Sequence, residues 1–103
     1  MCATLPHALE LARKGYAGRP SIFGDDVLGW ALARNGDCGK ALRYSNRSLR
    51  LGTKDALKLF HRGWIAACLH RDAEARGFYR RALALNPHFS ILWAPVARKG
   101  VTS

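Results

Sequence analysis

The chain has 103 residues, 49% of them hydrophobic, and its 17 Lys and Arg against 7 Asp and Glu give a net charge of +10. This length allows one domain at most, and the hydrophobic content excludes a disordered tail. No apolar run approaches the ~18 residues that a membrane-spanning helix needs.

Helical signals begin near the amino terminus. Apolar side chains follow helical spacing at Ala8, Leu11, Ala12 and Tyr16, and Gly15, Gly18 and Pro20 mark the end of this predicted helix. A second helix is predicted from about Ser21 or Ile22 to Asn35. It ends at Asn35 and Gly36, because both residue types accept the left-handed conformation that closes many helices.

Further helices follow at regular intervals. A helix is predicted over 39–51, where Asp37 can cap its start and Gly52 can end it. Two more helices are predicted over 56–69 and 73–85. A last helical segment over 90–99 is expected to be disturbed by its proline, Pro95. No strand-like alternation appears, so the predicted fold is all-α.

The sequence also repeats itself. The dipeptide Gly29-Trp30 returns as Gly63-Trp64, at the offset of 34 residues that separates the two glycines. At the same offset lie five further identical pairs: Ala33 and Ala67, Ala41 and Ala75, Arg47 and Arg81, Leu49 and Leu83, Leu51 and Leu85. A fixed period of this length is typical of stacked supersecondary units.

Each period holds a helix, a tight turn and a second helix. The chain therefore divides into a half repeat over 4–20, repeats over 22–55 and 56–89, and a C-terminal capping helix over 90–99. Two antiparallel helices approach closely only where small residues leave room. The predicted repeat-packing residues are Gly29, Ala41, Gly63, Ala75 and Pro87.

This pattern resembles the tetratricopeptide repeat family. The second copy carries Leu59, Gly63, Ala75, Tyr79, Ala82-Leu83 and Pro87 at the positions of the family motif, and the first copy carries Leu28-Gly29, Gly36 and Ala41. It departs from the motif at Asp25, Ser45, Thr53, Arg62 and His70. The resemblance implies an α-solenoid of about five to six helices in antiparallel hairpins, acting as a protein-protein interaction scaffold.

In this family the first helices of successive hairpins line a concave face. On these helices the implied partner-binding groove consists of Phe23, Asp26, Trp30, Arg34, Leu57, Phe60 and Trp64. Aromatic side chains bury a large area at small entropic cost, so such a groove suits a peptide or a helix of a partner protein. Alternatively, the last segment with Trp93 folds over these rings and buries them.

The strong positive charge opens a second reading. Cations follow helical steps along the second helix of each pair, namely Lys40, Arg43, Arg47, Arg50, Arg76, Arg80 and Arg81. They form either a solvated convex face or a surface that binds nucleic acid, RNA above all. The aliphatic and aromatic concave face argues against base recognition.

Catalysis is not expected. The four histidines have no metal-ligand spacing, no carboxylate pair suggests itself, and no cofactor is implied. Cys2, Cys38 and Cys68 are odd in number and irregularly spaced, and no secretory signal is recognisable, so free thiols and a cytoplasmic location are expected. Because two repeats are few for a solenoid, self-association or a longer array is also expected.

Overall fold

The computed structural model describes residues 10, 13–14, 22–50, 52 and 54–102. Five α-helices follow one another in this part of the chain: α2 (Ile22–Arg34), α3 (Cys38–Leu49), α4 (Ala56–Cys68), α5 (Asp72–Leu85) and α6 (Ala94–Thr102). The predicted half repeat over 4–20 falls almost entirely outside the described residues. The all-α fold class is confirmed.

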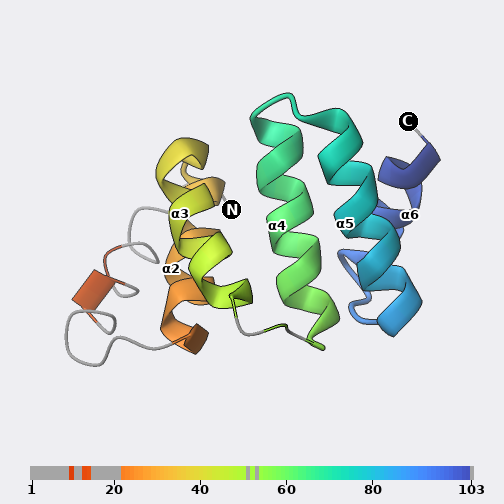
Figure 1. Ribbon diagram of the computed structural model, residues 1–103, viewed down its shortest axis with the longest axis horizontal. Helices are drawn as coiled ribbons and strands as arrows, with labels where there is room; N and C mark the ends of the chain where they lie inside the picture. The colour runs from red at the N-terminus through yellow and green to blue at the C-terminus, as the bar shows by residue number, and fades with distance from the viewer. Residues whose placement is uncertain (1–9, 11–12, 15–21, 51, 53, 103) are drawn as a thin grey trace.

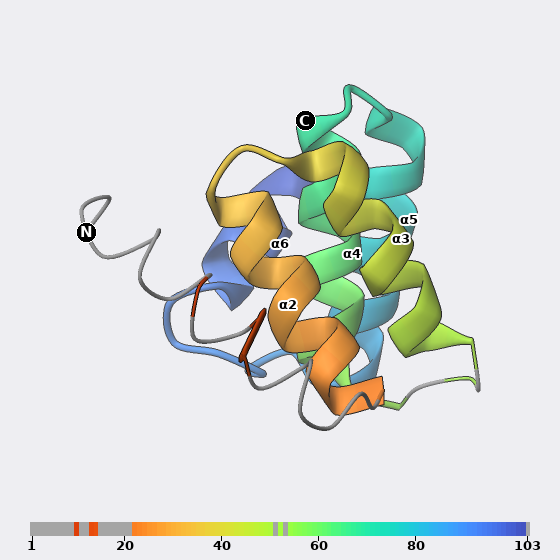
Figure 2. The same cartoon turned by 90° about the vertical axis from the view of Figure 1, so that its left-hand side faces the viewer.

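Adjacent helices pack against one another in chain order, as Figure 1 shows. α2 and α3 form one antiparallel hairpin, α4 and α5 form the next, and α6 lies against α5. The first helices of the two hairpins, α2 and α4, also touch. Viewed from its α2 side, the molecule shows the first hairpin in front of the second (Figure 2). This is the TPR-like arrangement that the 34-residue period predicts.

Short-range signals set the helix ends. Gly36 (φ 89°) and Gly52 (φ 71°) adopt the left-handed conformation after α2 and α3. The Asp55 carboxylate accepts a hydrogen bond from the Leu57 amide at 3.0 Å and so caps α4. The helices α2 to α5 therefore begin and end within two residues of their predicted bounds.

The last helix differs from its prediction. α6 covers Ala94–Thr102, not 90–99, and it follows a turn in which the Trp93 amide donates to Ser90 Oγ at 3.1 Å. Pro95 lies in the first turn of α6, where its missing N–H removes no helical hydrogen bond. The expectation that Pro95 disturbs this helix is wrong for that reason.

Glycines let the paired helices approach. A methyl group at Gly29 would lie 3.3 Å from the Ala41 carbonyl oxygen on α3. A methyl group at Gly63 would lie only 2.8 Å from the Tyr79 ring on α5, and one at Gly100 would lie 2.5 Å from the other edge of that ring. Tyr79 is thus held between a glycine of α4 and a glycine of α6.

Two departures from the family motif are buried polar residues. Arg62 is 5% exposed, and its guanidinium donates to Asn46 Oδ1 at 2.7 Å and to the Glu74 carboxylate. Asp25 is 3% exposed and lies 3.6 Å from a guanidinium nitrogen of Arg47. These contacts link α4 to α3 and α5, and α2 to α3, at positions where the motif places apolar side chains.

The expectation of free thiols is wrong for two of the three cysteines. Cys38 at the start of α3 and Cys68 at the end of α4 form a disulfide, with their Cα atoms 6.4 Å apart. Stacking of the two hairpins brings together these ends, which lie 30 residues apart in sequence. The prediction of a cytoplasmic location loses the support of free thiols, since disulfides persist in oxidising compartments.

Candidate functional site

All three tryptophans of the chain meet at one place. Trp30 comes from α2, Trp64 from α4 and Trp93 from the turn before α6; we call these three residues the Trp box. The ring centroids of Trp30 and Trp64 are 5.2 Å apart at 75°, and those of Trp30 and Trp93 are 5.4 Å apart at 85°. Trp64 and Trp93 thus stand nearly perpendicular to Trp30, and all three rings are half-buried.

The repeat explains how two of these rings meet. Trp30 and Trp64 occupy equivalent positions on α2 and α4, and these helices pack against each other. Equivalent side chains of stacked hairpins therefore face the same way and lie next to each other. Both rings also contact the hydrophobic clusters of both hairpins, so they join the two halves of the core.

The C-terminal segment covers one part of the predicted groove. Phe60 is fully buried, and its ring centroid lies 5.6 Å from that of Trp93 and 5.5 Å from that of Phe89. Leu57 is half-buried and packs against the same cluster. The structure therefore places Phe60 in the core, with the segment before α6 folded over it.

Arg34 lies at the Trp box. Its guanidinium carbon is 5.7 Å from the Trp30 centroid, 5.8 Å from Trp64 and 5.2 Å from Trp93. A guanidinium within about 6 Å of a ring face is attracted by the quadrupole of the ring. One cation thus contacts three rings, and Arg34 itself is half-buried.

Asp26 faces inward. Its Oδ1 lies 2.9 Å from His61 Nδ1, both side chains are buried, and the His61 ring stacks on Trp30 with centroids 4.1 Å apart. The carboxylate therefore positions His61 against Trp30 from inside the fold. The last predicted groove residue, Phe23, has its side chain outside the described part of the structure.

A groove that sequence reasoning missed adjoins the Trp box. It has a volume of about 660 Å³ between α4, α5 and α6. Its lining residues are Trp64, Ala67, Cys68, Asp72, Ala75, Arg76, Tyr79, Val96, Lys99 and Gly100. We call it the α4–α6 groove. Its α6 wall lies beyond the second repeat, where the sequence carried no periodic signal to locate it.

Tyr79 forms the floor of the α4–α6 groove. The side chain is 5% exposed, and its ring stacks on Phe60 with centroids 5.6 Å apart. Burial raises the pKa of the Tyr79 phenol to about 12, because the anion loses its hydration there. Tyr79 is therefore neutral at physiological pH and contributes an apolar ring to the groove.

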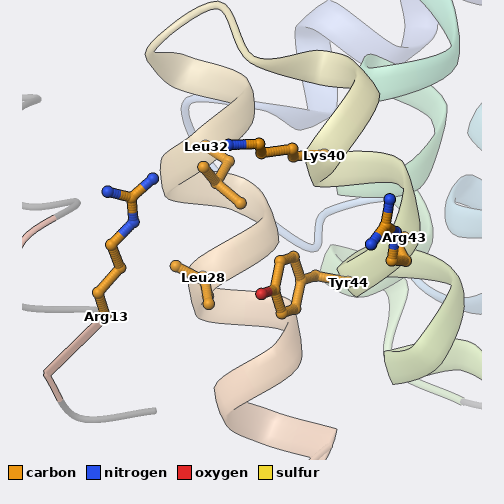
Figure 3. Close-up of a pocket in the computed structure, with 6 residues that line it drawn as sticks. All are labelled: Arg13, Leu28, Leu32, Lys40, Arg43 and Tyr44. Atoms are coloured by element: carbon orange, nitrogen blue, oxygen red, sulfur yellow. The ribbon is translucent and has the colours of Figure 1, made fainter. Parts of the chain in front are cut away.

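A smaller pocket of about 330 Å³ lies against the first hairpin. Arg13 reaches it from the N-terminal segment, Leu28 and Leu32 line it from α2, and Lys40, Arg43 and Tyr44 line it from α3 (Figure 3). Three cations thus surround a small apolar surface.

Some of the predicted convex cations also form ion pairs within the chain, as Lys40 does with Asp37 at 3.9 Å.

Within the ranges that the structure describes, no group of three or more His, Cys, Asp or Glu side chains could hold a metal ion. Among the described helices, none combines the length and the apolar character that a bilayer span requires.

Comparison with known proteins identifies the second hairpin. A tetratricopeptide repeat family model matches residues 56–89, which span α4, α5 and the turn that follows them. These are the bounds that the 34-residue period predicts for the second repeat. A search of curated proteins found no match to the chain. Residues 56–89 are therefore a tetratricopeptide repeat, set within a small all-helical protein.

Proposed function

We propose that this protein is an interaction module that binds a peptide or a helix of a partner protein. The contact surface combines the Trp box with the α4–α6 groove. A tetratricopeptide repeat suggests such a module, because stacked helical hairpins create extended surfaces for binding. No catalytic role is assigned to any residue.

The observation that carries this proposal is the continuity of the two features. Trp64 belongs both to the Trp box and to the wall of the α4–α6 groove, and its ring is half-buried. Partly accessible aromatic rings beside an apolar groove supply the anchors that dominate binding energy in many interfaces. Asp72, Arg76 and Lys99 line the groove beside its apolar side chains.

Val96 offers a variant that changes the groove without opening the core. It lines the groove and is 38% exposed, so Val96→Glu places a charge there at small cost to folding. Ile91 is the matched control, because it is fully exposed and does not line the groove. We expect proteins captured from a cell extract by the wild type to be lost with Val96→Glu and kept with Ile91→Glu. Equal capture by both variants would refute the groove.

Two of the predicted groove residues, Trp30 and Trp64, can be tested in the same capture experiment. Replacing both by alanine should abolish the capture. Circular dichroism melting must accompany it, because both rings also contact the core clusters. Repeating the capture at low and high salt separates binding through apolar contacts, which persists, from binding through surface charge, which weakens.

A second candidate function is nucleic-acid binding by the basic convex face. The observation in its favour is the gathering of Arg13, Lys40 and Arg43 around one pocket, together with the net charge of +10. Anisotropy of a labelled single-stranded RNA tests it. An affinity that falls steeply with salt and depends on sequence would support this function. Weak binding without sequence preference would show only the attraction of a basic surface.

Self-association is the remaining proposal for the partner. Ile91 is fully exposed, Leu92 is 64% exposed and Val96 is 38% exposed, so apolar side chains gather around the start of α6. Analytical ultracentrifugation over a range of concentrations tests this proposal. A single monomeric species at micromolar concentration would contradict it.

A further inference from the structure

We infer that the Trp box is a binding site for an arginine side chain of the partner protein, which enters in exchange with Arg34. The inference rests on the proposed function, because it assumes that a partner binds at this face. It adds the chemical class of the group that the box recognises.

The geometry of the box suits a guanidinium. Trp30 forms one side, and Trp64 and Trp93 meet it at 75° and 85°. The guanidinium carbon of Arg34 lies 5.2 to 5.8 Å from all three centroids, so a planar cation of this size fits between the rings. Arg34 thus shows directly which ligand chemistry the box accepts.

The box is the principal contact of the Arg34 charge. Arg47, Arg62 and Arg71 each lie within 4.0 Å of a carboxylate oxygen. Arg34 has no such ion pair with any residue in the described ranges. Its position in the last turn of α2 is favourable for a cation, because the carbonyl ends of the helix point there. Arg34 can therefore leave the box without breaking an ion pair to any described carboxylate.

Exchange requires only a side-chain movement. Arg34 is the last residue of α2, and the exposed residues Asn35 and Gly36 follow it. The three rings and Arg34 are each half-buried, so all four side chains keep part of their surface accessible to solvent. Rotation of the long Arg34 side chain away from the rings therefore vacates the box without unfolding a helix. Arg34 acts as a tethered competitor, and its removal should tighten binding of an external arginine.

Charge gives this site a recognisable salt dependence. The net charge of +10 repels a cationic ligand at long range. Added salt screens that repulsion and should strengthen arginine binding or leave it unchanged. Binding of a polyanion to the basic face would respond in the opposite direction.

The three tryptophans provide the assay, because they are the only indoles of the chain and all belong to the box. N-acetylarginine amide is titrated into the wild type and Arg34→Ala, with the neutral isostere N-acetylcitrulline amide as the control ligand. We expect saturable fluorescence changes with the arginine probe only. If Arg34 fills the box about nine-tenths of the time, its removal tightens binding about tenfold. Arg50→Ala, which removes an exposed arginine of another helix end, should behave like the wild type.

The outcomes divide clearly. Equal responses to arginine and citrulline probes in Arg34→Ala, or no response at all, would overturn the inference. So would an unchanged arginine response after Trp93→Ala is added to Arg34→Ala. If capture of a partner is lost with Val96→Glu while Arg34→Ala ignores arginine, the proposed function stands and the arginine site fails. If Arg34→Ala binds arginine while no partner depends on Val96, the site stands and the proposed groove fails.

Discussion

Gly63 is the residue whose replacement tests the packing of the second hairpin most directly. A methyl group added there would lie 2.8 Å from the Tyr79 ring and 3.1 Å from Phe78 Cβ. The ring cannot move away easily. Its opposite edge meets Gly100 of α6, where an added methyl group would lie 2.5 Å away, and its face stacks on Phe60.

Two effects of Gly63→Ala oppose each other. Alanine is favoured over glycine in a helix interior by about 1 kcal/mol. Overpacking of a tight core site costs roughly 1–3 kcal/mol, and the confinement of Tyr79 places this site at the upper end. We therefore expect a net loss of about 2 kcal/mol, which corresponds to a fall in Tm of roughly 8–16 °C for a domain of this size.

Gly77 provides the matched control for this substitution. It lies inside α5, and a methyl group there would meet nothing within 4 Å. Gly77→Ala should therefore stabilise the protein by about 1 kcal/mol. Thermal and urea unfolding followed by circular dichroism measure both variants. A Gly63→Ala protein as stable as Gly77→Ala would refute the close approach of α4, Tyr79 and α6. In a Tyr79→Leu background, the cost of the Gly63 methyl group should shrink.

Three further predictions concern single features of the structure. His70 has φ 60° at the position equivalent to Gly36, a conformation that glycine adopts without strain. His70→Gly should therefore raise the free energy of unfolding by roughly 0.5–1 kcal/mol. A lower free energy of unfolding in urea would contradict this. Glu74→Ala leaves the buried Arg62 guanidinium without its carboxylate and should lower the free energy of unfolding by roughly 3 kcal/mol. Adding Arg62→Leu should restore stability, because the unpaired buried charge is then removed. A double variant as unstable as Glu74→Ala would disprove this reasoning. The Tyr79 phenol has a folded-state pKa of about 12 against 10.0 for the free group. Its contribution to the free energy of unfolding is therefore complete below pH 10 and is lost as the pH rises toward 12. Tyr79→Phe should remove this loss from unfolding curves measured across that pH range.

The sequence alone determined the elements and their repetition. Apolar spacing located α2 to α5, and Gly36, Gly52 and Asp55 marked their ends, because these signals act within one or two helical turns. The 34-residue period then predicted stacked hairpins, in which Trp30 and Trp64 occupy equivalent positions of the two copies. Each of these inferences needs only local geometry and the equivalence of the copies.

Only the tertiary structure decided what the groove residues contact. Trp93 packs on Trp30 and Phe60, although it belongs to a segment that the repeat does not reach. Asp26 turns inward to His61, and Cys38 is joined to Cys68. These contacts depend on the distance and rotation between stacked helices. Residue spacing within a single helix carries no information on either quantity, so side chains predicted to share one face could still be covered by a segment from elsewhere in the chain.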